Sequence, residues 1–188
     1  MRDIDIRRTL HRTHLSVFQN DPNTIIIDEL GLSQGDARID IAVINGNLHG
    51  IEIKSERDTL ERLPSQEKIY SKILDTVTLV TGENHIQKAT EMVPNWWGII
   101  LAKQSHKNIE LNEVRPAEAN QNIEPYSVAQ LLWRDESLAI LTSFNLANGI
   151  RGKPRSYLWE VLADNLPLDS LCSIVRETLK KRQRWRVG

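Results

Sequence analysis

Two short apolar runs on either side of an Asn-Gly turn constrain the fold more than any other feature of this sequence. The runs, residues 38–44 and 48–54, are rich in isoleucine and valine, and Asn45-Gly46-Asn47 separates them. An Asn-Gly pair between two strand-like runs strongly indicates a β-hairpin, because both residues readily adopt the backbone angles of a tight turn. The sequence therefore predicts an antiparallel hairpin centred on Gly46.

Three ionisable residues interrupt this apolar hairpin. Asp40 lies between two isoleucines in the first run, and Glu52 and Lys54 are separated by one residue in the second. Because strand side chains alternate between faces, Glu52 and Lys54 point the same way. Position 46 is midway between 40 and 52, so Asp40 is expected to lie opposite the neighbourhood of Glu52. Two carboxylates and an ammonium group should then converge on one patch of the sheet.

Such a patch is costly to bury unless its charges are paired or bound to an ion. Mg²⁺ prefers oxygen ligands, so Asp40, Glu52 and the backbone carbonyl of Ile53 form a plausible ligand set, with Mn²⁺ as a substitute. Glu29 could complete the acidic cluster, although Asp28 beside it is an alternative ligand. With such an ion bound, Lys54 could position or deprotonate a water molecule, or neutralise charge on a phosphate.

Simpler interpretations stand beside this one. Glu52 and Lys54 could form a solvent-facing edge with only the intervening isoleucines buried, although this does not explain Asp40. Asp58 could cap the following helix instead of contacting a substrate. His49 is expected on the face opposite Glu52, and Trp96-Trp97 is more typical of core packing than of base stacking.

The rest of the chain alternates helical and strand-like patterns, which predicts an α/β fold with a central mixed sheet flanked by helices. We expect a core over residues 1–114, a linker over residues 115–125 and a helical C-terminal region over residues 126–188 packed on the core. Helices are expected at residues 4–18, 60–74, 85–92, 128–133, 136–144, 156–165 and 168–184, and further strands at residues 24–27, 76–81, 96–102 and 109–114.

Composition excludes several classes of protein. The single cysteine, Cys172, provides neither a disulfide framework nor zinc-ligand spacing. Apolar runs fall far short of the roughly 18 residues of a membrane span, so we expect a cytoplasmic protein without a membrane partner. The 24 basic and 25 acidic residues nearly balance, but basic ends flank an acid-rich centre. That distribution suits a metal site flanked by surfaces for a polyanion, or basic ends that only aid solubility.

The Asp40…Glu52-Ile53-Lys54 arrangement resembles the PD-(D/E)xK nuclease superfamily, with Ile39 where the nominal proline would stand. Gln66 and Tyr70, four apart on the next helix, are similar to the Gln-x-x-x-Tyr element of its RecB-like branch. A bacterial and phage family of that superfamily is similar over a wider stretch, in Glu29-Leu30-Gly31, Arg38-Ile39-Asp40, His49-Gly50-Ile51-Glu52-Ile53-Lys54-Ser55, Asp58-Thr59-Leu60-Glu61-Arg62-Leu63 and Trp96-Trp97-Gly98. The resemblance implies a restriction-endonuclease-like core.

It also implies Mg²⁺-dependent hydrolysis of phosphodiester bonds in DNA, with Asp40, Glu52 and Lys54 as catalytic residues. Gln66 and Tyr70 would orient the nucleic-acid strand, and Arg38 and Ser55, which are near the site in sequence, are further candidates for substrate contact.

Two other hypotheses remain open at this stage. The first is a nuclease-like module that binds nucleic acid or a partner protein without cutting. The second is an enzyme specific for DNA structure, such as a junction resolvase, which would require a homodimer.

Overall fold

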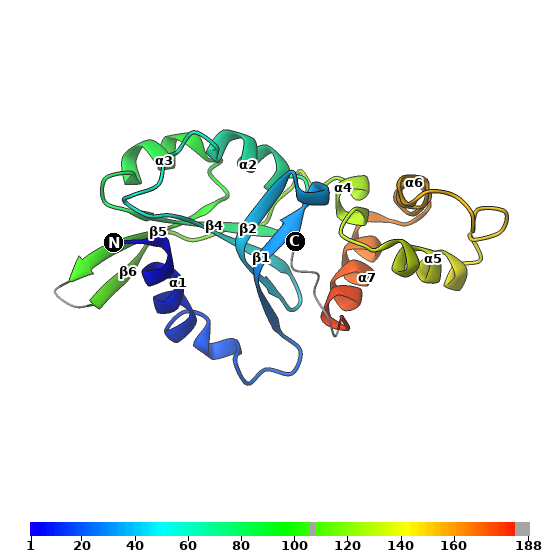
Figure 1. Cartoon of the computed structure of the whole chain (residues 1–188), viewed down its shortest axis with the longest axis horizontal. Coiled ribbons are helices and arrows are strands. Elements are labelled where there is room, and N and C mark those ends of the chain that lie inside the picture. Colours follow the sequence, from blue (N-terminus) through cyan, green and yellow to red (C-terminus); the bar gives the residue numbers. More distant parts are fainter. Residues whose placement is uncertain (106–107, 183–188) are drawn as a thin grey trace.

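A six-stranded mixed sheet forms the centre of the protein in the computed structural model, which describes residues 1–105 and 108–182 (Figure 1). The strands lie in the order in which they occur along the chain. The β3–β4 and β4–β5 pairs are parallel and the other three pairs are antiparallel. The strands are β1 (Ile25–Leu32), β2 (Ala37–Ile44), β3 (Leu48–Lys54), β4 (Thr76–Gly82), β5 (Gly98–Ser105) and β6 (Asn108–Arg115). The predicted α/β fold with a mixed sheet flanked by helices is confirmed.

The central hairpin has the register that the turn predicts. Ile41 pairs with Ile51 and Ile44 pairs with Leu48, so the hairpin is centred on position 46. The Asn45 N–H closes the turn by donating to the Asn47 carbonyl at 3.0 Å. This register brings Asp40, one residue beyond the last pair, next to the end of β3.

Helices cover both faces of the sheet. Helix α1 (Asp3–Arg12) packs on one face, and α2 (Leu63–Tyr70) and α3 (Ile86–Met92) lie on the other, where they follow β3 and β4 (Figure 1). Parallel strands require such crossover connections. Two apolar layers result. The layer between α1 and the sheet contains two residues of α1, Ile6 and Leu10, and the strand residues Ile41, Val43, Ile51, Ile53 and Val80.

The first helix is shorter than the sequence pattern predicts. It ends at Arg12, and a separate 3₁₀ turn covers Ser16–Phe18. Thr13 has non-helical angles (φ −117°, ψ −81°), and its hydroxyl donates to the Thr9 carbonyl at 2.8 Å. The helix therefore ends where the backbone of Thr13 leaves helical geometry.

Strand β5 also differs slightly from its expected range, because it begins at Gly98 and not at Trp96. Trp97 precedes it in a turn, where its N–H donates to the Pro94 carbonyl at 3.1 Å. The Trp97 side chain is fully buried and stacks on Tyr70 with 6.0 Å between ring centroids. The expectation of core packing is therefore confirmed for Trp97.

Within residues 116–182, four helices follow the sheet and share its larger apolar cluster (Figure 1). They are α4 (Pro125–Ala129), α5 (Arg134–Ser143), α6 (Arg155–Asn165) and α7 (Leu168–Lys180). Helix α4 begins earlier than expected because Pro125 suits the first turn of a helix. Helix α7 ends at Lys180, before the expected residue 184, and residues 183–188 lie outside the described part. None of the helices in the described ranges is long and apolar enough to cross a membrane.

The segment expected to be a linker is anchored to the sheet domain. The Asn120 side chain is buried and donates to the carbonyls of Ser71 and Leu74 at 2.7 and 2.8 Å. Further along, Arg176 of α7 pairs with Asp75 at 2.9 Å. The basic residues of α7 are thus partly engaged within the protein.

Candidate active site

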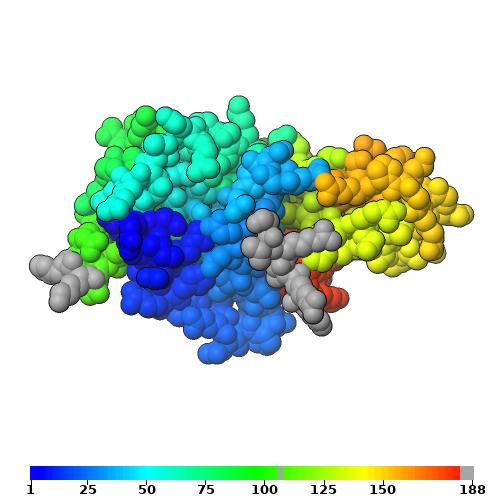
Figure 2. Space-filling view, viewed as in Figure 1, coloured from blue at the N-terminus to red at the C-terminus, as the bar shows by residue number. Residues whose placement is uncertain are grey.

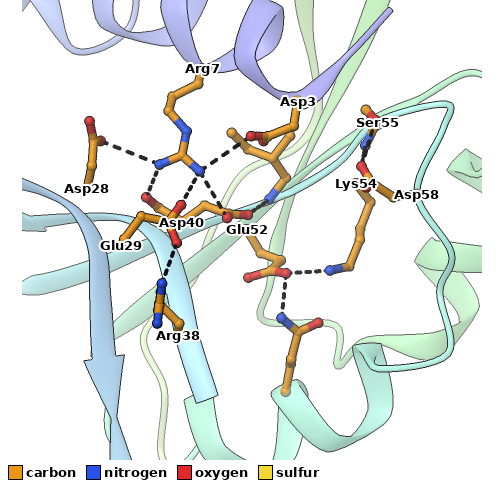
Figure 3. Close-up of polar contacts among 12 residues, drawn as sticks. Asp3, Arg7, Asp28, Glu29, Arg38, Asp40, Glu52, Lys54, Ser55 and Asp58 are labelled. Atoms are coloured by element: carbon orange, nitrogen blue, oxygen red, sulfur yellow. Dashed lines mark hydrogen bonds and ion pairs between the residues drawn. The ribbon is translucent and has the colours of Figure 1, made fainter. Parts of the chain in front are cut away.

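The structure brings Asp40, Glu52 and Lys54 together in one polar cavity of about 470 Å³. The cavity lies where β2 begins and β3 ends, between α1 on one side and α2 on the other (Figure 3). Asp40 comes from β2, while Glu52 and Lys54 come from β3. The convergence follows from the hairpin register, because Asp40 and Glu52 are equally far from the turn.

Glu52 is the most enclosed of these side chains and is held from three sides. It is 2% exposed, and its Oε1 accepts hydrogen bonds from Lys54 Nζ at 2.5 Å and from Gln66 Nε2 at 2.7 Å. Its Oε2 lies 2.7 Å from the Tyr70 hydroxyl. Lys54 is 4% exposed. The alternative that Glu52 and Lys54 form a solvent-facing edge is therefore wrong.

Gln66 and Tyr70 come from one face of α2 and meet the strand residues as a pair. The Gln66 amide donates to the Tyr70 hydroxyl at 3.1 Å, and that hydroxyl also lies 2.8 Å from the Arg38 carbonyl. Burial, and next the charge of Glu52, raise the pKa of Tyr70 above its usual value, so this phenol stays protonated. The helix thus fixes the orientation of the Glu52 carboxylate.

Asp40 bridges the two strands and the first helix. Its Oδ2 accepts the backbone N–H of Ile53 at 2.7 Å, and its Oδ1 accepts a hydrogen bond from Arg7 at 3.1 Å. Burial, and next the neighbouring Glu52 carboxylate, raise the pKa of Asp40 well above the usual range of an aspartate. A cation beside the Asp40 and Glu52 carboxylates would offset the cost of burying Asp40 and the repulsion between the two negative charges.

Arg7 is one of the residues of this site that sequence reasoning missed, together with Asp3. Its side chain reaches from α1 into the acidic cluster and is 10% exposed (Figure 3). The guanidinium lies 2.5 Å from Glu29, 3.1 Å from Asp40, 3.5 Å from Asp3 and 3.8 Å from Asp28. It also donates to the Asp40 carbonyl at 2.7 Å. One signal could have identified it: Arg7 stands between Ile6 and Leu10 on the face of α1 that packs against the sheet.

Glu29 lies at the rim of the cavity and faces arginines. Its side chain is 45% exposed and contacts Arg7 and Arg38, the latter at 3.6 Å. Glu29 has a φ of +59° and is skipped in the β1–β2 register, where Asp28 pairs with Ile41 and Leu30 with Ile39. This irregularity is what turns Glu29 toward the cluster.

Ser55 and Asp58 close the loop that follows β3. The Ser55 N–H and hydroxyl both donate to Asp58 Oδ2, at 2.7 and 2.6 Å. Asp58 does not cap the next helix, because α2 begins only at Leu63. Ser55 is 1% exposed and therefore supports the loop at the edge of the cavity.

Comparison with known proteins places the chain in a phage family. The family model described as bacteriophage P4 protein cII matches residues 8–186. The chain belongs to this family. It is 24% identical to protein cII of Enterobacteria phage P4 over 157 residues, which are 84% of this chain and 59% of that protein. The chain therefore spans about 59% of the length of this curated relative. No solved structure matches.

Most of the site of this cII-family protein lies inside the matched segment, which includes every candidate residue from Glu29 to Tyr70; Arg7 lies one residue before it. His49, on the same strand as Glu52, is directed away from the cavity and bonds to Thr76 at 2.6 Å. The expected position of His49, on the face opposite Glu52, is confirmed.

The donor set fits a hard divalent cation that keeps much of its water. Among the described residues no group of three or more His, Cys, Asp or Glu side chains is placed to hold a metal ion. Mg²⁺ characteristically takes only one or two carboxylates from a protein, together with waters and a carbonyl. Asp40, Glu52 and the Ile53 carbonyl meet that requirement. The Gln66 Oε1 atom is buried without a hydrogen-bond partner in the described part of the chain, so it could accept from a bound water.

Proposed function

We propose that this cII-family protein is a metal-dependent deoxyribonuclease with a restriction-endonuclease-like core. The observation that carries the proposal is the buried Glu52–Lys54 pair, joined at 2.5 Å and facing the same polar cavity as Asp40. A buried ion pair contributes little to stability relative to apolar packing, so its presence in a strand of isoleucines favours a functional role. The same three residue types at these positions resemble the PD-(D/E)xK arrangement.

Asp40 and Glu52 would hold Mg²⁺ or Mn²⁺ together with the backbone carbonyl of Ile53. The cation would supply Lewis-acid polarisation of the scissile phosphate and would acidify the attacking water. Lys54 would place its ammonium beside the phosphate, where it neutralises developing negative charge or orients that water. DNA as the substrate rests on the superfamily resemblance.

The hydrogen bonds of α2 give Gln66 and Tyr70 a positioning role. Both side chains contact Glu52, and the Tyr70 hydroxyl also contacts the backbone of β2 at Arg38. They hold the carboxylate in one orientation before any ligand binds. Such preorganisation of ligand side chains by their neighbours is what metal sites require.

The test is a cleavage assay with the purified protein on linear, single-stranded, circular and branched DNA in Mg²⁺ or Mn²⁺. EDTA and the variant Lys54→Ala serve as controls, and Lys68→Ala, an exposed lysine of α2, is the matched variant. Cleavage that requires the metal, is lost in Lys54→Ala and persists in Lys68→Ala would support the proposal. Cleavage of branched DNA alone would indicate a structure-specific enzyme.

A second candidate function is a nuclease-like module that binds nucleic acid or a partner protein without cutting. The observation that favours it is Arg7, which already provides Asp40 with a cationic partner at 3.1 Å. Folded protein that neither cleaves any DNA form nor binds Mn²⁺ in calorimetry would support this candidate over the enzyme.

A further inference from the structure

A groove of about 770 Å³ runs along α1 next to the candidate active site. One wall is the exposed side of α1, and the other is formed by the hairpin of β5 and β6 at Gln104, Asn108 and Ile109. Figure 2 shows this arrangement at the surface, with the dark blue N-terminal segment beside the green segment that contains β5 and β6.

Two arginines of this groove stand outside its close ion pairs. Arg8 and Arg12 are exposed and form no ion pair or hydrogen bond with the described residues. The two acidic residues of the groove have other close partners, since Asp5 pairs with Arg2 at 3.2 Å, and Asp28 lies 3.0 Å from His11 and 3.8 Å from Arg7. The positive charge available to a ligand therefore comes from Arg8 and Arg12.

The spacing of these arginines suits a phosphodiester chain. Arg8 and Arg12 are four residues apart on one helix and are therefore separated by about 6 Å along its axis. Each strand of DNA carries one phosphate per ~3.4 Å of duplex axis, so both guanidinium groups can reach phosphates of the same strand. Ile4, 39% exposed in the same groove, offers an apolar surface to a sugar or a base.

The groove and the active-site cavity meet at Arg7, which lines both. A strand that lies along α1 is therefore directed toward Asp40 and Glu52. We propose that this groove binds the phosphodiester backbone of the DNA strand presented to the site, with Arg8 and Arg12 contacting phosphates. This proposal rests on the proposed nuclease function, because only a site that cleaves DNA requires a strand to be directed toward it.

The test is DNA binding by fluorescence anisotropy in EDTA, where no cleavage can occur. The double variant Arg8→Gln/Arg12→Gln is compared with the wild type on a labelled single strand and on the matching duplex, in NaCl from 50 to 200 mM. The matched control is Lys68→Gln/Lys88→Gln, which removes the same charge from exposed positions on α2 and α3, across the sheet.

We expect about tenfold weaker binding by the arginine variant at low salt, and little change in the control. The slope of log affinity against log salt should become shallower by about 1.4 on the single strand or about 1.8 on the duplex, for two lost phosphate contacts. The form of DNA that shows the larger loss is the one that occupies the groove.

Equal affinity losses in the two double variants, or none in the arginine variant, would overturn the proposal, as would a wild type that binds neither DNA. Metal-dependent cleavage with no effect of the Arg8 and Arg12 substitutions on DNA binding would support the nuclease function and contradict the groove as a DNA-binding site. DNA binding that depends on these arginines, without cleavage of any DNA form, would support the groove as a DNA-binding site and contradict the nuclease function.

Discussion

Removing one charge of the Glu52–Lys54 pair should destabilise the fold much more than removing both. The pair is buried, with side-chain exposures of 2% and 6% and an N–O distance of 2.5 Å. Lys54→Met leaves a buried carboxylate with only neutral partners, which costs about 3–5 kcal/mol. Glu52→Gln leaves a buried ammonium at a similar cost. The double variant Glu52→Gln/Lys54→Met leaves no charge uncompensated, so its loss should be smaller than that of either single variant.

The assay is urea unfolding in EDTA, followed by the fluorescence of the buried tryptophans Trp97 and Trp159. With an m-value of about 2 kcal/mol/M, a single variant should lower the unfolding midpoint by about 1.5–2.5 M. The double variant should recover at least half of that shift, which corresponds to a coupling energy of several kcal/mol. Additive losses in the double variant would refute the reasoning, because they would show that the two charges are not paired in the folded protein.

Three further outcomes follow from individual residues. Burial lowers the pKa of His49 to about 4. As the pH falls, His49 therefore takes up a proton near pH 6.5 in the unfolded chain but only near pH 4 in the folded chain. The free energy of unfolding should thus decrease by up to about 3 kcal/mol between pH 6.5 and pH 4. Urea midpoints at pH 7 and pH 4.5 should differ less in His49→Gln than in the wild type, and an equal difference would contradict this. Gly98→Ala should cost about 1–3 kcal/mol, because the new Cβ would lie 2.8 Å from the Ala117 backbone nitrogen. Gly152→Ala, where no atom lies within 4 Å, is its control, and equal unfolding midpoints of the two variants would contradict the clash. Burial raises the pKa of Cys172 to about 11, so iodoacetamide at pH 8 should label the native thiol far more slowly than the urea-unfolded one; equal rates would argue that this thiol is open to solvent.

The hairpin and the meeting of Asp40 with Glu52 could be predicted because both depend on local rules. A tight turn at Gly46 fixes the register, and alternation along a strand fixes which side chains share a face. The candidate site therefore followed from a single turn and the positions of three charges.

The partners of Arg7 and the choice between Asp28 and Glu29 could not be predicted in this way. The contact between Arg7 and Asp40 joins residues 33 positions apart and depends on how α1 is placed on the sheet. Glu29 turns toward the cluster through an irregularity of β1 at a φ of +59°, which no alternation pattern contains. Tertiary contacts of this kind are decided by packing, to which a single sequence gives little access.

The central claim is that Asp40 and Glu52 hold a divalent cation, and a calorimetric titration of the metal-free protein with Mn²⁺ tests it most directly. The account predicts saturable binding in the wild type that is lost in Asp40→Asn and in Glu52→Gln. It predicts unchanged binding in Asp164→Asn, an exposed carboxylate of α6. Absence of binding in folded wild type, or equal affinity in all four proteins, would contradict a metal centre at these two carboxylates.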